Sequence, residues 1–180
     1  MTKCTDRKFF DSDNGHDIFV RYKRDDKNVV VYDIDEVAFV SGRLTDKLQG
    51  KIKNKALSLE LLWVNPESRG RGLITTMLLC LFETHRHALI SDMEMSSDGV
   101  KLWKKLCDLV HITTIYQVNV VTNEVTETNK EQMTQCMLVP ELKFIIEDAR
   151  TYDKLEEMGI PTLIGKYRML TRYNLFEGFD

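Results

Sequence analysis

The stretch VNPESRGRGLI, residues 64–74, decides the fold, because the spacing of apolar residues changes there from that of a strand to that of a helix. The preceding segment KALSLELLWV, residues 55–64, alternates like a strand and stops at Asn65-Pro66. After Arg69 the apolar residues follow helical spacing around most of the helix, which is typical of a buried crossover between parallel strands. The alternation predicts one strand face with Leu57, Leu59 and Leu61, and another with Ser58, Glu60 and Leu62. The helical residues are Leu73, Met77, Leu78, Leu81 and Phe82.

The loop between this strand and this helix has the features of an anion site. Gly70 and Gly72 let the backbone approach a ligand closely, because no side chain intervenes. The helix that follows offers unpaired N–H groups and the positive end of its dipole, while Arg69 and Arg71 add cationic side chains. Together these features favour a phosphate or pyrophosphate, although Arg-Gly-Arg-Gly is also compatible with a solvated turn. The chain lacks the G-x-x-x-x-G-K-[ST] motif, and a G-x-G without a third glycine is weak evidence for a dinucleotide site.

Upstream of this stretch, β-branched and aromatic residues predict an antiparallel meander. The first 17 residues are polar and rich in turn formers, so we expect a loop there. Strands are predicted at 18–22, 28–35 and 36–44, and a polar connection at 45–54 precedes the strand described above.

Downstream, strands and helices alternate. We predict a short strand at 88–91, a helix from Ser96 or Ser97 to Val110, and a strand at 111–121. This order predicts right-handed parallel crossovers, and hence an α/β fold in which the meander is followed by a parallel β-α-β-α-β unit in one mixed central sheet. The inward stripe of the helix is Val100, Trp103, Leu106 and Val110.

The last third of the chain is less regular. Residues 122–132 are polar, with a turn-like TNEVT sequence. Residues 143–148, a short helix around 151–158 and residues 161–170 could complete an edge of the sheet. An exposed edge at 161–170 would also allow a homodimer by strand pairing.

Composition narrows the class of protein. The 180 residues carry a net charge of -3, which argues against general nucleic-acid binding. No run approaches the roughly 18 apolar residues that a membrane span needs, and the charged N-terminal sequence lacks a signal-peptide pattern, so we expect a cytoplasmic protein. The four cysteines form no C-x-x-C pair, and the histidines have no metal-binding spacing, so we expect no metal site.

The motif V-x-P-x-x-R-G-x-G, carried by Val64, Pro66, Arg69, Gly70 and Gly72, resembles the acetyl-CoA-binding signature of the GNAT (Gcn5-related N-acetyltransferase) superfamily. The resemblance implies acetyl-CoA, or another acyl-CoA, as cofactor. Its pyrophosphate would lie on backbone N–H groups of the loop, and its pantetheine arm would pair with the preceding strand edge. The family usually has glycine or alanine where this chain has Ile74, a bulkier residue that would narrow the cradle. The loop residues are Arg69, Gly70, Arg71, Gly72, Leu73 and Ile74, with Thr75 nearby, and the edge residues are Leu62, Trp63 and Val64.

A second, weaker resemblance lies on the next helix. The family often has Asn, Ala and Tyr at the spacing where this chain has Ser96, Gly99 and Trp103. The resemblance implies that Ser96 hydrogen-bonds CoA. Tryptophan cannot protonate a leaving thiolate as the family's tyrosine does, so Trp103 is expected in the core or in the wall of the CoA site. The pattern D-x-x-x-S-x-x-G-x-x-L-W is also similar to acetyltransferase-like proteins encoded by tailed phages.

Transfer of an acyl group to an amine needs a base and an oxyanion donor. The family often has a carboxylate at the position of Glu60, which we nominate as general base, with an exposed strand residue as the alternative. Asp92 would orient the amine or simply mark the entry to the next helix. The oxyanion donor would be the backbone N–H near Val64.

The resemblance therefore implies an N-acyltransferase that transfers an acetyl group directly, in a ternary complex, to a primary amine of a small molecule, a protein or an RNA-borne aminoacyl group. Residues 1–121 would form the acetyl-CoA-binding core. Residues 122–180 would be a C-terminal extension of the same domain that completes the sheet or the acceptor cleft. The alternative is a weakly active or inactive GNAT-fold module that binds a host or partner protein.

Overall fold

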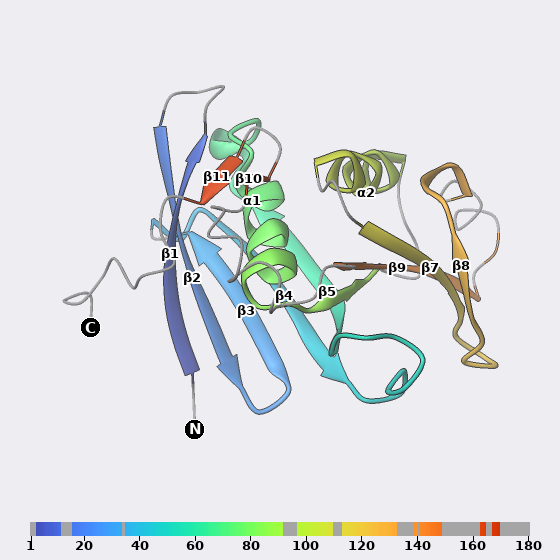
Figure 1. The fold of residues 1–180 in the computed structure, drawn as a ribbon. Coiled ribbons are helices and arrows are strands. Elements are labelled where there is room, and N and C mark those ends of the chain that lie inside the picture. Colours follow the sequence, from blue (N-terminus) through green and yellow to red (C-terminus); the bar gives the residue numbers. More distant parts are fainter. Residues whose placement is uncertain are drawn as a thin grey trace.

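Over the residues that it describes, the computed structural model forms one mixed sheet of eleven strands with two helices on one face (Figure 1). It describes residues 3–11, 16–33, 35–91, 97–109, 113–132, 139, 141–148, 163–164 and 167–169. The first strands are β1 (Lys3–Asp11), β2 (His16–Asp25), β3 (Asn28–Asp33), β4 (Ala38–Thr45), β5 (Ala56–Val64) and β6 (Ala88–Ile90). The later strands are β7 (Thr113–Asn119), β8 (Val125–Thr128), β9 (Leu142–Asp148), β10 (Leu163–Ile164) and β11 (Tyr167–Met169). The helices are the 3-10 turn η1 (Pro66–Ser68), α1 (Leu73–Leu79), its π-helical continuation η2 (Cys80–Thr84), and α2 (Ser97–Leu109).

The strand order confirms the predicted fold class. It runs β10-β11-β1-β2-β3-β4-β5-β6-β9-β7-β8, with antiparallel pairing from β1 to β5 and a parallel pair formed by β5 and β6. The helical segment α1–η2 is the crossover between the two parallel strands. Both β6 and β7 pair antiparallel with β9, so they run in the same direction without touching.

The position of β9 corrects one prediction. Residues 143–148 were expected at a sheet edge, but β9 lies inside the sheet between β6 and β7. The reason is strand pairing, because β9 is hydrogen-bonded to β6 on one side and to β7 on the other. Its apolar run of Phe144, Ile145 and Ile146 is buried, as suits a strand inside the sheet. Within the predicted edge at 161–170, the described residues form β10, the last strand in the order, and β11, which pairs with β1.

Two strands lie where the polar composition predicted loops. The N-terminal strand β1 pairs with β2 along its whole length, from Lys3 opposite Arg24 to Asp11 opposite His16. The strand β8 pairs with β7 within the polar stretch 122–132. Ladder hydrogen bonds join backbone groups whatever the side chains are, so strand neighbours overrode a weak local preference. The predicted helix around 151–158 lies outside the described residues.

The main core lies between the sheet and the helices, as the helical patterns predict. All five predicted apolar residues of the first helical segment are buried, and Cys80 joins them as a buried free thiol. The stripe of α2 is confirmed at Val100, Trp103 and Leu106, while Val110 lies outside the described residues. Trp103 belongs to this core. Within the described chain no helix has the length and hydrophobicity of a bilayer span.

The opposite face of the sheet, here called the open face, has a smaller core beneath the loop that joins β4 to β5. It consists of Leu48, Ala56, Ala88, Ile90, Val118 and Ile145. Glu147 is buried beside it and accepts a hydrogen bond from the backbone N–H of Asn54, which ties the loop to β9. Burial raises the pKa of the Glu147 carboxyl, and the hydrogen bonds from Asn54 and Tyr116 oppose this rise. The loop therefore has a fixed position over the open face.

Candidate functional site

A β-bulge on β5 shapes the candidate site. The register changes from Gly42 opposite Leu59 to Ser41 opposite Leu61, which leaves Glu60 as an extra residue on β5. The extra residue reverses the alternation of side chains for the rest of the strand.

The reversal corrects the predicted faces of this strand. Leu62 lies opposite Val40, a core residue, and directly opposed residues share a face. Leu62 therefore belongs to the helix-covered face, and its neighbour Leu61 to the open face. The prediction was right for Leu57 and Leu59, which are both in the main core, and wrong for Leu61 and Leu62. A strict period of two cannot anticipate an extra residue.

Gly42 makes the bulge possible by allowing two backbones to approach closely. A Cβ atom at position 42 would lie 2.6 Å from the carbonyl oxygen of Ser58 and 3.1 Å from the Leu57 side chain. Because the close neighbour is a backbone atom, it cannot move aside cheaply. Glycine is the residue that fits opposite this part of β5.

Next to the bulge, the sheet divides. The strands β5 and β6 pair only from Ala56 opposite Ala88 to Ser58 opposite Ile90. Among the described residues, the rest of β5 has no strand partner on this side. Leu61, Leu62 and Trp63 are 51%, 39% and 41% exposed on this segment. A free strand edge with accessible N–H and C=O groups can accept an extended ligand as an added strand.

The loop after β5 is folded tightly. Asn65 donates its backbone N–H to the carbonyl of Val37 at 2.7 Å, and its side chain accepts the N–H of Glu67 at 3.2 Å. Gly70 and Gly72 have φ angles of 79° and 74°, in the left-handed region that glycine adopts without strain. The backbone N–H and hydroxyl of Thr76 both donate to the carbonyl of Gly72, at 3.0 and 2.9 Å, which fixes the start of α1.

A cavity of about 250 Å³, here called the loop cavity, lies in this turn. Three exposed cationic side chains surround it, from Arg69, Arg71 and Lys105. The first N–H groups of a helix have no partner within the helix, so those of α1 add donors beside the cations. Ile74 is half-buried and packs against the main core as well as lining the cavity. The full lining is Val64, Ser68, Arg69, Gly70, Arg71, Gly72, Leu73, Ile74, Thr75 and Lys105.

Besides the buried Ser68 of the loop, Lys105 is the residue of this cavity that sequence reasoning missed. The helical pattern of 97–109 places it on the exposed side of α2, which the structure bears out. Nothing in the spacing indicates that α2 packs beside α1 with this side chain at the loop. A contact between two helices far apart in sequence needs the three-dimensional fold.

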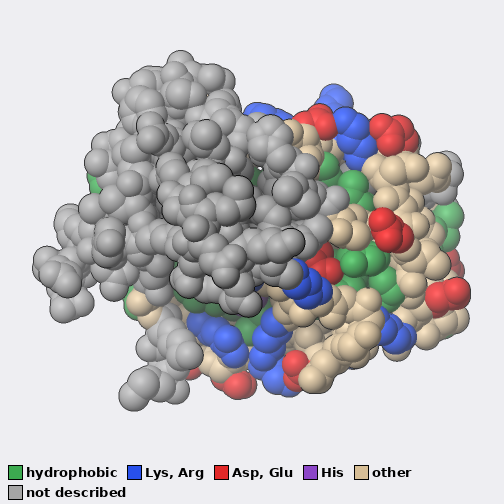
Figure 2. Space-filling view, viewed as in Figure 1, with side chains coloured by type: hydrophobic (Ala, Val, Ile, Leu, Met, Phe, Trp, Pro, Cys, Tyr) green, Lys and Arg blue, Asp and Glu red, His purple; other side chains and the backbone are tan. Residues whose placement is uncertain are grey.

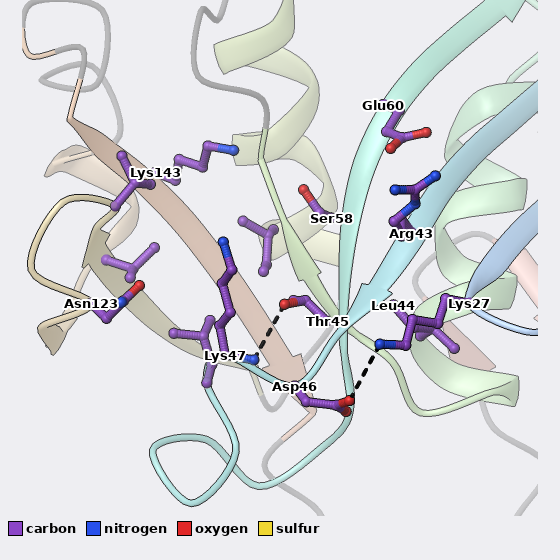
Figure 3. Close-up of a pocket in the computed structure, with 14 residues that line it drawn as sticks. Lys27, Arg43, Leu44, Thr45, Asp46, Lys47, Ser58, Glu60, Asn123 and Lys143 are labelled. Carbon is purple, nitrogen blue, oxygen red and sulfur yellow. Dashed lines mark hydrogen bonds and ion pairs between the residues drawn. The ribbon is translucent and has the colours of Figure 1, made fainter.

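A larger cavity of about 620 Å³, the open-face cavity, lies on the other face of the sheet. Its floor includes the buried side chains of Leu48, Ile90 and Val118, and charged side chains form much of its wall. Glu60 is exposed in the wall beside Arg43, on the neighbouring strand (Figure 3). The lining is Lys27, Arg43, Leu44, Thr45, Asp46, Lys47, Leu48, Ser58, Glu60, Ile90, Val118, Val120, Asn123 and Lys143.

The structure thus places most of the candidate residues along β5 and its following loop. Val64 and the residues from Arg69 to Thr75 border the loop cavity, Leu62 and Trp63 lie on the free edge, and Glu60 lines the open-face cavity. Asp92 and Ser96 lie outside the described residues, so their roles stay predictions. In the coloured part of Figure 2, side chains of both charges are interspersed.

Two of the histidines, His85 and His87, pack against Tyr22 just before the start of β6. The Nε2 atom of His87 lies 3.0 Å from the Tyr22 hydroxyl, and the His85 ring stacks on Tyr22 with centroids 3.6 Å apart. Burial, with smaller contributions from the charges of Arg24 and Lys55, lowers the pKa of His87 to about 4. Across the described residues no three His, Cys, Asp or Glu side chains are grouped as a metal site would need.

Solved structures that resemble this chain include two of low sequence identity. No family model matches the sequence, and no curated protein matches it. One structure, described as "Putative acetyltransferase from GNAT family from Bacteroides thetaiotaomicron", is 13% identical over 75% of this chain and 69% of that one, with a TM-score of 0.37. Nourseothricin acetyltransferase is 15% identical over 83% of this chain and 88% of that one, with a TM-score of 0.38. Both are named as acetyltransferases, but likenesses at these TM-scores leave the function to be inferred from this chain's own site.

Proposed function

We propose that this protein is an acyl-CoA-dependent N-acyltransferase that uses acetyl-CoA and a primary amine. The observation that carries the proposal is the arrangement along one strand. The loop cavity, the free edge and the open-face cavity follow one another along β5 and the loop after it. Such a transfer needs three parts. They are a site whose cationic side chains bind the phosphates, a strand edge for the extended arm of the cofactor, and a cavity with a carboxylate.

The loop cavity suits the pyrophosphate of CoA. Arg69, Arg71 and Lys105 supply positive charge, and the glycine backbone lets N–H groups approach the phosphate oxygens. The pantetheine arm would lie along Leu62 to Val64 and use its amide groups as an added strand would. The packing of Ile74 against the core reduces the obstruction that its size would otherwise cause.

The chemistry assigned to the chain's own residues follows from this placement. Acetyl-CoA would supply an acyl group activated as a thioester. The bulge puts Glu60 on the open face, where its carboxylate would accept a proton from the ammonium group of the acceptor. Unpaired backbone N–H groups near Val64 would donate to the oxygen that becomes negative during transfer.

Calorimetric titration with acetyl-CoA tests the cofactor site. The parent protein should bind, and Gly72→Glu should lose binding, because a glutamate there adds bulk and negative charge beside the pyrophosphate. Gly50→Glu is a matched control, since Gly50 also has a left-handed φ, of 81°, but lies outside the loop cavity. If the parent does not bind acetyl-CoA, or both variants behave alike, the cofactor proposal is wrong. A binding module for a protein partner would then be the better hypothesis.

Glu60→Gln tests the base in an assay of CoA release with a panel of amines. We expect a loss of turnover of about 10²- to 10⁴-fold at neutral pH, the usual contribution of a general base. Acetyl-CoA affinity should be unchanged, because Glu60 lies in the open-face cavity and not in the loop cavity. Unaltered turnover in the variant would remove Glu60 from the mechanism.

A further inference from the structure

The lining of the open-face cavity is positively charged, although the protein as a whole has a negative net charge. Four cationic side chains and two acidic ones line it, in a protein whose net charge is -3. Such an imbalance on a concave wall concentrates positive potential inside the cavity.

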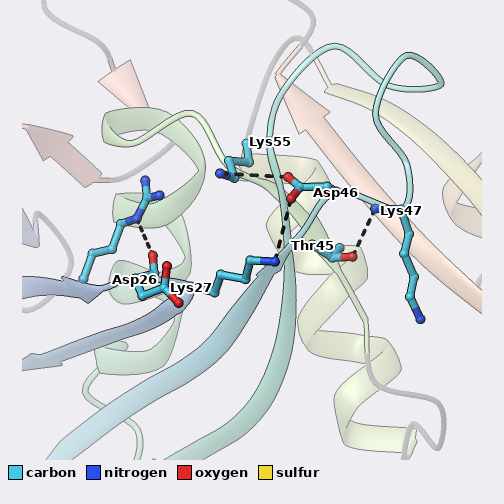
Figure 4. A network of polar contacts seen from close by, with 7 residues as sticks. Asp26, Lys27, Thr45, Asp46, Lys47 and Lys55 are labelled. Carbon is cyan, nitrogen blue, oxygen red and sulfur yellow. Dashed lines mark hydrogen bonds and ion pairs between the residues drawn. The ribbon is translucent and has the colours of Figure 1, made fainter.

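The contacts of Asp46 increase this imbalance. Its carboxylate lies 3.9 Å from the Nζ atom of Lys27 and 4.0 Å from that of Lys55, so its charge is directed to two lysines (Figure 4). Each of these exposed pairs is weak, but Lys55, which is not part of the lining, adds a further positive charge beside the cavity wall. Lys27 is held in its ion pair with Asp46 and is therefore less available to a ligand.

Three cations remain for a ligand, namely Arg43, Lys47 and Lys143. None of them has an ion pair within the described residues. They come from β4, from the loop after it and from β9, so they surround the cavity on several sides. In Figure 3 the side chains of Lys47 and Lys143 extend from the wall towards the interior.

Glu60 is the acidic side chain of the wall that has no lysine partner in the described residues. A carboxylate beside three cations is the complement of a ligand with one positive and at least one negative group. The apolar floor and the volume of about 620 Å³ are in the range for a small molecule.

We propose that the acceptor is a small molecule that carries an anionic group, either a carboxylate or a phosphate, beside its primary amine. This inference rests on the proposed function and names its substrate class. Arg43, Lys47 and Lys143 hold the anionic group, and Glu60 receives the ammonium group. A polycationic amine is disfavoured, because its second charge would meet the lysines without a partner.

The proposed transfer conserves atoms and charge. One ammonium proton moves to Glu60 and from there to solvent, and the amine nitrogen bonds to the thioester carbonyl carbon. The C–S bond breaks, and the leaving thiolate takes the second proton from nitrogen. The amide product has lost the positive charge that Glu60 attracted, so its affinity for the cavity falls and release is favoured.

Direct binding separates this inference from the proposed function. Four amines of similar size, namely ethanolamine, β-alanine, O-phosphoethanolamine and 1,3-diaminopropane, are titrated calorimetrically into the protein without acetyl-CoA. We expect β-alanine, O-phosphoethanolamine or both to bind at least about tenfold more tightly than ethanolamine, the size expected for hydrogen bonds to a charged group. The two anionic probes distinguish a carboxylate ligand from a phosphate ligand.

Variants that neutralise single lysines test whether the preference for anionic probes comes from the open-face cavity. Lys47→Gln and Lys143→Gln should each reduce the preference for the anionic probe, while Lys101→Gln should not, because Lys101 makes its ion pair with Asp98 on α2. The inference is overturned if ethanolamine or diaminopropane binds as tightly as the anionic probes. It is equally overturned if neither anionic probe binds at millimolar concentration, or if the preference survives both cavity variants.

CoA release is measured in parallel with the same amines. Release with ethanolamine or diaminopropane but not with the anionic amines would retain the proposed function and refute the substrate class. Anion-selective binding without release of CoA from any amine would retain the anion site and refute the transfer reaction. The two failures therefore have different signatures.

Discussion

Protonation of His87 should make the protein markedly less stable in acid. The side chain is 6% exposed, and its pKa is lowered to about 4, first by burial and then by the charges of Arg24 and Lys55. In the unfolded chain the pKa of the histidine returns to its ordinary value of 6.5. The folded protein therefore binds this proton less readily than the unfolded chain does.

The sign and size of the effect follow from this difference. Because the pKa is lower in the folded state, the full stability is present above pH 6.5 and is lost progressively as the pH falls from 6.5 to about 4. At about 1.4 kcal/mol per pH unit, the loss from this one group approaches about 3 kcal/mol at the lower limit. This is a large share of the 5–15 kcal/mol that typically holds a domain folded.

Urea unfolding at a series of pH values, followed by circular dichroism, measures the effect. The comparison that matters is the slope of unfolding free energy against pH in the parent and in His87→Gln. The variant loses the contact with Tyr22 at every pH, but only the parent has the extra acid dependence between pH 4 and 6.5. Glu147, whose pKa is raised by burial, acts in the opposite direction in both proteins and cancels in the difference. Equal slopes of unfolding free energy against pH in the two proteins would refute the assignment of this acid dependence to His87.

Two further predictions concern the site. Gly42→Ala should destabilise the protein by roughly 2 kcal/mol and reduce turnover, because its Cβ atom would meet the Ser58 carbonyl at 2.6 Å and disturb the bulge that presents Glu60. Thermal unfolding and turnover check this against Gly50→Ala, where a Cβ atom meets nothing within 4 Å but a left-handed φ of 81° costs about 1–2 kcal/mol. Gly50→Ala should keep full turnover, and equal turnover in the two variants would contradict the argument. Lys105→Gln should weaken acetyl-CoA binding by a few-fold to about tenfold, while Lys101→Gln, on the same helix, should leave it unchanged. Equal affinity in the parent and Lys105→Gln would remove Lys105 from the phosphate site.

The sequence predicted those parts of the fold that depend on local pattern. The buried crossover helix, the strand before it and the stripe of α2 all follow from the spacing of apolar residues, and burial confirms them. The strand β1 was missed because its polar composition resembles a loop, and its stability comes from pairing with β2. The place of β9 was wrong because strand order depends on which neighbours pair, and a period of two says nothing about neighbours.

In the candidate site, too, only the part formed by consecutive residues could be predicted from the sequence. The basic loop could be found from Arg69 to Gly72 alone, because charge, glycine and helix start are consecutive in sequence. The open-face cavity could not, because Arg43, Lys47 and Lys143 come together only through the fold. Sequence reasoning therefore suggested a cofactor and an amine acceptor, but not the chemical class to which the acceptor belongs.

The bulge links these two parts of the site into one arrangement. Without the extra residue, Leu61 would continue on the same face as Leu57 and Leu59, and Leu62 would share the open face with Ser58. With it, Glu60 and Leu61 both lie towards the open face, while Leu62 and Val64 turn to the helix-covered side. One strand can then present a carboxylate to an acceptor on one face and lead to a phosphate site beside the helices on the other. Gly42 permits this geometry and lines neither cavity, so a substitution at this position is expected to disturb both.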